Sequence, residues 1–201
     1  MSSCIPEGDA RLLQARVPRF SGLRVSLETP EVYPAAVLQP GFRLRGPMTQ
    51  ESLQDRFAPE NRCFGCGPAN ERGLRIKSIP AGDEVLCEWT PQKHHEAFEN
   101  MLNGGICGAL LDCHMNWTAA WHLMQANELE VPPCTVTAEF TVKLTRPTPT
   151  GGPVHMRAHV VESSRRKAVV EATLEAGGEV TARGRGVFVA VEEDHPAYHR
   201  W

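Results

Sequence analysis

The sequence predicts an α+β fold in which a curved antiparallel sheet of about six strands wraps around one long helix. Three observations lead to this prediction. Only one long segment, at residues 104–125, has the apolar periodicity of a helix. Two strand-like segments precede it, and four follow it. Because a single helix must cover the whole sheet, a sheet curved around that helix is the economical arrangement.

The chain has 201 residues, which suits one domain with an appendage or two small domains. Residues 1–60 are rich in proline and arginine, and we interpret them as an N-terminal extension of irregular structure. Residues 61–193 are expected to form the main domain, and residues 194–201 a C-terminal tail.

The extension contains three short patterns. Two pieces, GLRVSLE and AAVLQ, are strand-like. The third, MTQESLQDRF at residues 48–57, predicts a short helix with Thr49 as its N-cap and with Leu53 and Phe57 facing inward.

The main domain begins with RCFGCGPANERGL, which is typical of a loop. LRIKSI and EVLCEWT then predict two strands around the turn at residues 80–83. After the helix, we expect a meander of four strands: TVTAEFTVKL, VHMRAHVVES, KAVVEATLEA and VTARGRGVFVAV. In KAVVEATLEA, small apolar residues alternate with Glu and Thr, which indicates an antiparallel strand with one solvated face.

Composition excludes several classes of function. The net charge of −3 does not favour nucleic acid as a partner. No apolar run is long enough to span a membrane, and the charged N-terminus is unlike a signal peptide. An odd count of seven cysteines fits free thiols in a reducing compartment. We therefore expect a cytoplasmic protein, with no cofactor and no membrane partner.

The predicted helix combines an apolar stripe with a second, bare face. At ~100° per residue, one stripe should pack against the sheet. Its members are Ile106, Ala109, Leu110, Cys113, Trp117, Ala120, Trp121 and Met124. Asp112 lies roughly 120° from this stripe, on the face of Gly105, Gly108 and Asn116. A face without side chains lets a ligand or another backbone approach, so Asp112 should look along a bare groove.

The start of this helix suggests an oxyanion hole. Asn103 is a favourable N-cap, which places Gly104 and Gly105 in the first turn. Backbone N–H groups there have no partner within the helix, and the helix dipole favours negative charge beside them. Donors of this kind contribute ~3–4 kcal/mol of transition-state stabilisation in other enzymes. Two adjacent glycines before a helix also occur simply as a turn with close packing.

The stretch HHEAFENMLNGGICGALLDC resembles the hotdog-fold thioesterases, in particular the PaaI-like acyl-CoA thioesterases. The family pattern H-x-G-[YF]-x-x-x-x-HGG-x-x-x-x-L-x-D is matched from His95 through Asn103 to Asp112. NRCFGCGPANERGL is similar to a common opening of the group, and TAEFTVKLTRPTP to its strand with an Arg-Pro turn. The order of elements inferred from the residues agrees with the hotdog fold.

This resemblance implies hydrolysis of an acyl-CoA thioester without a metal. It implies that Asp112 is the catalytic acid, acting as nucleophile or as general base on water. Gly104 and Gly105 match the glycines whose N–H groups polarise the carbonyl, and Thr137 matches the hydroxyl that positions water or the carboxylate. His95 matches a polar position near the site. The family places this site at a dimer interface, so we expect a homodimer or a dimer of dimers.

The sequence departs from the family at Asn103, where the pattern has histidine. Asparagine caps a helix but cannot carry a proton. This departure favours a second hypothesis, a catalytically silent hotdog domain that binds acyl-CoA or a related ligand, or that acts as an interaction module. Asp112 and Thr137 favour the enzyme, because a binding module has no need of an acid on a bare groove.

Other candidate residues have weaker patterns. Cys63 and Cys66 form a CxxC motif, but zinc usually has four ligands and no second CxxC exists. His94 and His95 are a poor match to a zinc spacing, so we expect a thiol pair that braces a glycine turn. Cys113 is expected to be inert in the apolar stripe. His114 points away from Asp112, which indicates a packing or interface role.

A basic run, Arg165-Arg166-Lys167, occupies a predicted hairpin turn. Such a run is usually solvated, but it is also a candidate for binding the phosphates of CoA, with Arg183 and Arg185 as further candidates. For the substrate itself, we expect contacts from His95, Gly108 and Asn116.

Overall fold

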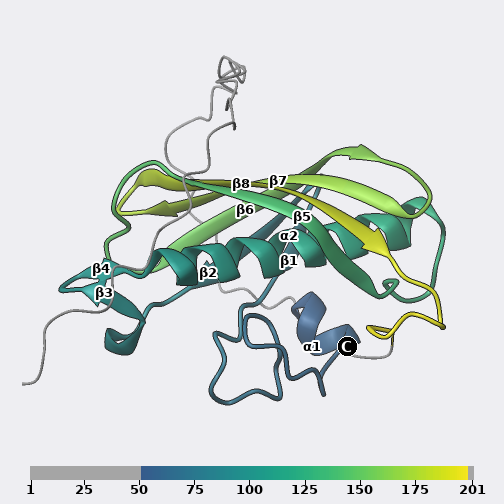
Figure 1. Cartoon of the computed structure of the whole chain (residues 1–201), viewed down its shortest axis with the longest axis horizontal. Coiled ribbons are helices and arrows are strands. Elements are labelled where there is room, and N and C mark those ends of the chain that lie inside the picture. The colour runs from purple at the N-terminus through teal and green to yellow at the C-terminus, as the bar shows by residue number, and fades with distance from the viewer. Residues whose placement is uncertain (1–50, 199–201) are drawn as a thin grey trace, which may run out of the picture. The chain divides into compact units, whose positions relative to one another are not determined.

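The computed structural model describes residues 51–198 and shows a sheet lying over one long helix (Figure 1). The segments GLRVSLE and AAVLQ lie outside the described residues. The described elements are α1 (Leu53–Phe57), β1 (Ile79–Ala81), β2 (Glu84–Trp89), the 3-10 helix η1 (Lys93–His95), β3 (Glu96–Phe98), β4 (Met101–Leu102), α2 (Gly104–Ala126), β5 (Thr135–Leu144), β6 (Val154–Ser163), β7 (Lys167–Ala176) and β8 (Glu179–Ala190). The predicted α+β class, with about six strands around one helix, is therefore confirmed.

The main sheet is antiparallel and has the strand order β1-β2-β6-β7-β8-β5. The predicted meander is confirmed for β6, β7 and β8, but it is wrong for β5, which pairs with β8 and leaves β2 beside β6. The reason lies in the connection after β5. It is too long for a tight hairpin, and its Thr148 carbonyl binds the Leu102 N–H while Pro149 bridges to Met101. The chain is thus carried away from β5 before β6 begins.

Residues 74–78 do not form the strand that LRIKSI predicted, because β1 begins only at Ile79. Their backbone groups bind elsewhere. Leu74 and Ile76 donate to the carbonyls of Phe64 and Gly65, and the Ser78 carbonyl accepts from Leu53. These bonds hold the segment against the preceding loop and α1 instead of against a neighbouring strand. The turn after β1 is placed as predicted, and Gly82 supplies its positive φ of 65°.

The short helix α1 forms within the predicted segment, but Ser52, not Thr49, is its N-cap. The Ser52 hydroxyl accepts a hydrogen bond from the Asp55 N–H at 3.1 Å. The helix starts later than predicted because this bond satisfies its first free amide. Leu53 is buried, and Phe57 packs against Trp121 with 6.4 Å between ring centroids. Leu53 and Phe57 therefore face inward as predicted.

The long helix α2 is covered on more than one side. Figure 1 shows the sheet on one side of α2, and α1 with the loop that follows it on another. The predicted apolar stripe is wrong as the sheet-facing surface. Instead, Leu111 and Met115 lie under Gly184 of β8, whereas Cys113 faces the loop at Gly65. A helix buried on several sides carries apolar residues around most of its circumference, so its periodicity does not identify one buried face. Within residues 51–198, no helix is long and apolar enough to cross a membrane.

Candidate active site

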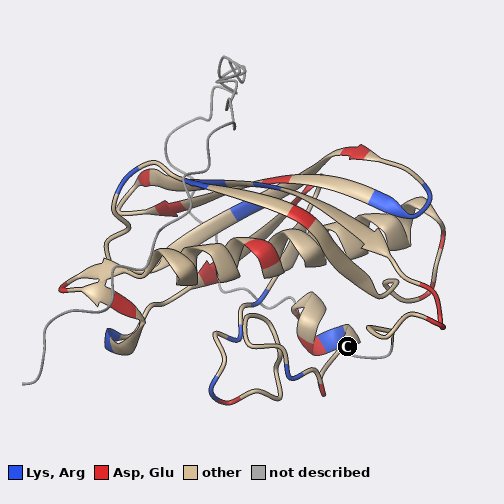
Figure 2. Ribbon diagram, viewed as in Figure 1, with Lys and Arg blue, Asp and Glu red and all other residues tan. Residues whose placement is uncertain are grey.

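Asp112 is the only Asp, Glu, Lys or Arg in α2, and Figure 2 shows the rest of that helix without charged residues. Its Oδ1 accepts a hydrogen bond from the Thr137 hydroxyl of β5 at 2.8 Å. Burial raises the pKa of the Asp112 carboxyl, and the Thr137 bond acts in the opposite direction. The structure therefore brings Asp112 and Thr137 together.

A second helix-to-strand contact aligns α2 with β5. The Thr135 hydroxyl donates to Asn116 Oδ1 at 2.6 Å, and the Asn116 amide donates to the Thr135 carbonyl at 3.4 Å. Asn116 is one helical turn from Asp112, and Thr135 is two strand positions from Thr137, so both pairs share one face of each element. The strand is irregular directly after Thr137, where its register with β8 shifts. The Asn116 side chain is thus engaged in holding β5 in place.

The face of α2 that carries Asp112 is open, as predicted from its glycines. A Cβ atom at Gly108 would meet no atom within 4 Å. At Gly105, a Cβ would approach only the Asn103 Oδ1, at 3.0 Å. Among the described residues, only the Asn103 side chain comes this close to either glycine, so the surface of α2 beside Gly108 is open to a ligand or to another chain.

The start of α2 has the predicted N-cap, and this cap occupies one of the two glycine amides. Asn103 is the N-cap, and its Oδ1 accepts from the Gly105 N–H at 2.8 Å. Among the described residues, none accepts a hydrogen bond from the N–H of Gly104. Thus the Gly104 amide is free, whereas the Gly105 amide is occupied by the Asn103 side chain.

His95 lies beside this helix start. Its carbonyl accepts from the Asn103 N–H at 3.0 Å, and its ring packs on Trp89 with 4.9 Å between centroids. The His95 Nδ1 accepts from the Gln92 N–H at 2.9 Å. Partial burial, followed by the neighbouring His94, lowers the pKa of His95. The structure therefore joins the His95 backbone to Asn103, while the His95 ring packs on Trp89.

Asp112 and the glycine amides are well separated within one chain. Asp112 lies seven positions after Gly105, which is about 10 Å along a helix axis. A single thioester carbonyl cannot lie within hydrogen-bond reach of both. If the two act on one carbonyl, they must come from different copies of the chain.

His114 is fully buried and does not face the groove. Its Nδ1 lies 2.9 Å from the Ser78 hydroxyl and its Nε2 lies 3.0 Å from the Val85 carbonyl. Burial lowers the pKa of His114 to about 4, so the ring is neutral at neutral pH. The packing role is confirmed, and the histidine connects α2 to β2.

The basic run at Arg165-Arg166-Lys167 lies at the opposite end of α2 from the glycines. The Arg165 carbonyl accepts from Asn127, which follows the last residue of the helix, about 22 Å along the axis from Asp112. Arg166 pairs with Glu192, and Lys167 with Glu162. Within one chain, the structure does not bring this run to Asp112.

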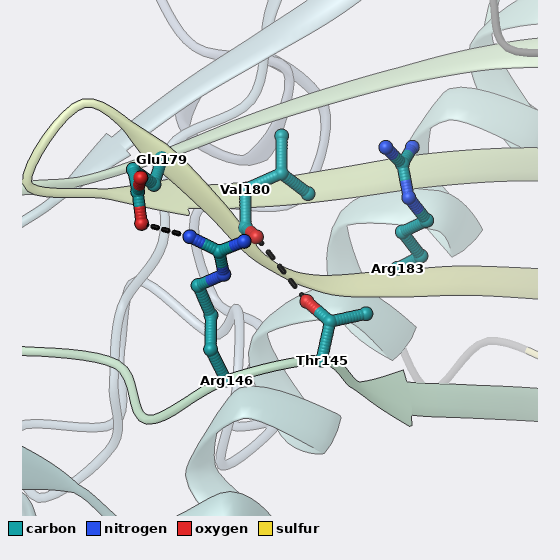
Figure 3. Close-up of a pocket in the computed structure, with 5 residues that line it drawn as sticks. All are labelled: Thr145, Arg146, Glu179, Val180 and Arg183. Carbon is teal, nitrogen blue, oxygen red and sulfur yellow. Dashed lines mark hydrogen bonds and ion pairs between the residues drawn. The ribbon is translucent and has the colours of Figure 1, made fainter.

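Arg183 and Arg185 alternate along β8 with Ala182, which is buried, and Gly184, which faces α2. The two arginines are therefore on the other face of the sheet. A pocket of about 400 Å³ next to Arg183 is lined by Thr145, Arg146, Glu179 and Val180 (Figure 3). In it, Arg146 pairs with Glu179, while Thr145 donates to the Val180 carbonyl at 3.2 Å.

One group of reactive side chains was not predicted. Cys63 and Cys66, in the loop after α1, meet Cys113 of α2, and the three sulfur atoms lie within 4.8 Å of one another. Sequence analysis identified the CxxC pair but assigned Cys113 to the sheet-facing stripe. Gly65 is the sequence feature that could have indicated the contact with Cys113, because a glycine between the two cysteines leaves room for a third side chain.

Comparisons with known proteins agree with this fold. Residues 96–189 match the family model described as acyl-CoA thioesterase N-terminal domain. A thioesterase superfamily protein from Shewanella loihica is 28% identical, with a TM-score of 0.51, over 62% of this chain and 98% of that one. No curated protein matches this chain.

Two more distant structures share the fold. A putative thioesterase from Ralstonia eutropha, described as phenylacetic acid degradation-related, is 17% identical with a TM-score of 0.51, over 63% of this chain and 92% of that one. An uncharacterised protein from Pyrococcus horikoshii is 20% identical with a TM-score of 0.50, over 66% of this chain and 95% of that one.

Proposed function

We propose that the chain is an acyl-CoA thioesterase of the hotdog-fold superfamily, in which Asp112 is the catalytic carboxylate. The observation that carries this proposal is the half-buried Asp112, held by Thr137 on the open glycine face of α2. A carboxylate on such a face is costly to bury, and among residues 51–198 its only hydrogen-bond partner is the threonine. The family match covers both residues and both glycines of the helix start.

The chemistry requires few groups. Asp112 takes a proton from water, the water oxygen attacks the thioester carbonyl, and negative charge develops on the carbonyl oxygen. Backbone N–H groups at the start of α2 stabilise that charge. The C–S bond then breaks, the CoA thiolate leaves and accepts a proton, and the free carboxylic acid remains. The alternative route, attack by Asp112 itself, passes through an anhydride that water then hydrolyses.

The separation between Gly105 and Asp112 supports a site shared by two subunits. The sheet ends at β5, the strand that holds Asp112 through Thr137, and β5 exposes Phe140 (44%) and Leu144 (53%). An exposed edge strand with apolar side chains is a surface for pairing with another chain. We propose a homodimer, or a dimer of dimers, in which Asp112 of one subunit faces the helix start of the other.

The occupied Gly105 amide favours one alternative, a hotdog domain that binds acyl-CoA without hydrolysing it. In that case the Asn103 side chain keeps the Gly105 N–H, and only Gly104 contacts the ligand carbonyl. In the enzyme, the substrate oxygen displaces Asn103 Oδ1. The two functions therefore differ in turnover, not in binding.

The test is an assay of the purified chain against acyl-CoAs from short-chain to aromatic, following release of free thiol. Asp112→Asn is assayed in parallel, because it keeps the size of the side chain and removes its charge. We expect turnover of at least one ester, lost by ~100-fold or more in the variant. A folded protein that binds CoA esters but hydrolyses none would establish the binding module instead.

Two matched variants of Gly105 test the role of the helix start. Gly105→Pro removes the N–H donor in the first helical turn, where proline is tolerated. Gly105→Ala keeps the donor and adds only a Cβ beside the Asn103 side chain. We expect the proline variant to lose kcat and the alanine variant to keep most of it. Equal kcat in both would remove Gly105 from the oxyanion role.

A further inference from the structure

The loop between α1 and β1 contacts α2 through a cluster of three thiols. Cys63 and Cys66 come from the loop, and Cys113 comes from the helix, directly after Asp112. All three are free cysteines; Cys63 is exposed, Cys113 is half-buried and Cys66 is buried. The three thiols come together from two distant segments of the chain, and the proposed hydrolysis of a thioester makes no use of them.

The spacing of the sulfur atoms fits a tetrahedral metal. The Cys63 and Cys113 Sγ atoms are 3.7 Å apart, and the third sulfur lies within 4.8 Å of both. With zinc–sulfur bonds of ~2.3 Å, the edge of a tetrahedron is about 3.8 Å. The cluster is thus close to the geometry that one zinc ion needs from three thiolates.

The loop is shaped to bring the sulfur atoms together. A Cβ atom at Gly65 would lie 2.3 Å from the Cys113 Sγ, so only glycine admits the helix thiol there. A Cβ at Gly67 would lie 2.5 Å from both the Asn61 carbonyl oxygen and the Cys63 nitrogen. The Gly67 N–H closes the turn by donating to the Cys63 carbonyl at 3.0 Å. Each glycine removes a side chain that would separate the thiols.

The loop also supplies donors to a thiolate. The backbone N–H groups of Cys66 and Gly65 lie within hydrogen-bond reach of the Cys63 sulfur. Amides that point at a cysteine sulfur stabilise its charged form, which is the form that binds metal. A site that stabilises one thiolate and holds two further thiols beside it is better suited to bind a thiophilic cation than to hold three neutral thiols.

We propose that Cys63, Cys66 and Cys113 bind one zinc ion through three thiolates, with a fourth ligand supplied from solvent on the exposed side of Cys63. Each thiol gives up its proton to solvent as its sulfur–zinc bond forms. A soft, all-sulfur ligand set selects zinc over magnesium or calcium. The ion ties the loop to the turn of α2 that carries Asp112. This inference does not depend on thioesterase activity.

The test measures metal on the reduced, full-length chain. Zinc content is determined after dialysis, and Co²⁺ is titrated as a spectroscopic probe. We expect about one zinc per chain, and a cobalt complex with thiolate-to-metal charge-transfer absorption and strong visible bands of a four-coordinate ion. Zinc should also protect Cys63, Cys66 and Cys113 from alkylation, read by peptide mass spectrometry.

Variants identify the ligands. Cys63→Ser removes an exposed ligand and should leave the fold intact, and Cys113→Ser removes the helix ligand; we expect each to weaken zinc binding by ~10-fold or more. Cys134→Ser is the matched control, because Cys134 lies outside the cluster, with its thiol donating to the Ala197 carbonyl. A reduced chain that binds no zinc, equal losses in the control, or a Cys63–Cys113 disulfide in place of metal would each overturn the proposal.

Discussion

Asn103 Oδ1 accepts a hydrogen bond from the Gly105 N–H at 2.8 Å, so the residue that caps α2 occupies an amide proposed to polarise the substrate. Asn103→Ala should therefore free that donor. We expect kcat/KM for thioester hydrolysis to rise, while loss of the cap lowers stability by about 1 kcal/mol. Steady-state kinetics and thermal unfolding measure the two effects.

The control for this variant is Asn103→Ser, which keeps a capping oxygen and should stay near the wild-type values. If Asn103→Ala loses stability without gaining activity, competition for the Gly105 amide is not limiting.

The Thr137 hydroxyl is the only described side chain that donates to Asp112. Thr137→Val keeps the shape of the side chain and removes the donor. Because hydrogen bonds to charged groups contribute roughly 1.5–3 kcal/mol, we expect kcat to fall by about 10- to 100-fold. Thr137→Ser restores the hydroxyl and should restore most of the rate. Equal rates in the valine and serine variants would show that the hydroxyl has no part in the reaction.

Gly108 is an interior helical glycine with open space beside it. Gly108→Ala should raise the stability of the chain by roughly 0.5–1 kcal/mol, because alanine is the better helix former and meets no atom. Gly108→Phe fills the groove toward Asp112 and should raise KM or abolish turnover. Denaturant unfolding and kinetics on both variants separate the effects. Full activity in Gly108→Phe would place the substrate elsewhere.

A variant of His114 tests whether this histidine, two positions after Asp112, has a packing role. His114→Ala removes contacts with Ser78 and Val85 and leaves a cavity, so we expect a loss of about 2–4 kcal/mol of stability. The kcat of the folded protein should stay within about threefold, whereas loss of a general base costs ~100-fold or more. A large loss of kcat at unchanged stability would reverse the assignment.

Much of the fold was predictable because its elements are long and regular. The predicted helix differs from α2 by one residue at its end, and the predicted strands at 135–144, 154–163 and 167–176 coincide with β5, β6 and β7. Asn103, Gly104 and Gly105 were placed correctly because capping and helix propensity are local. The Asp112–Thr137 contact joins two elements, and only the family resemblance indicated it.

The missed features all depend on tertiary contacts. β5 lies beside β8 because the loop after it binds Leu102 and Met101, which no local pattern reveals. Residues 74–78 carry strand-like sequence, but the adjacent loop takes their hydrogen bonds. The helical projection placed Cys113 among the apolar residues that were expected to face the sheet. Because α2 is covered on several sides, its sequence does not show that Cys113 contacts the loop at Gly65 instead.

The central claim is that Asp112 and the Gly105 amide act on one substrate from different subunits. It is tested most directly by mixing two inactive variants, Asp112→Asn and Gly105→Pro, and allowing their subunits to exchange. Random exchange makes half of the dimers mixed, and each mixed dimer has one intact site, so activity should recover to about a quarter of the wild-type value. Mixed dimers that form, as mass spectrometry can show, but remain inactive would contradict the account.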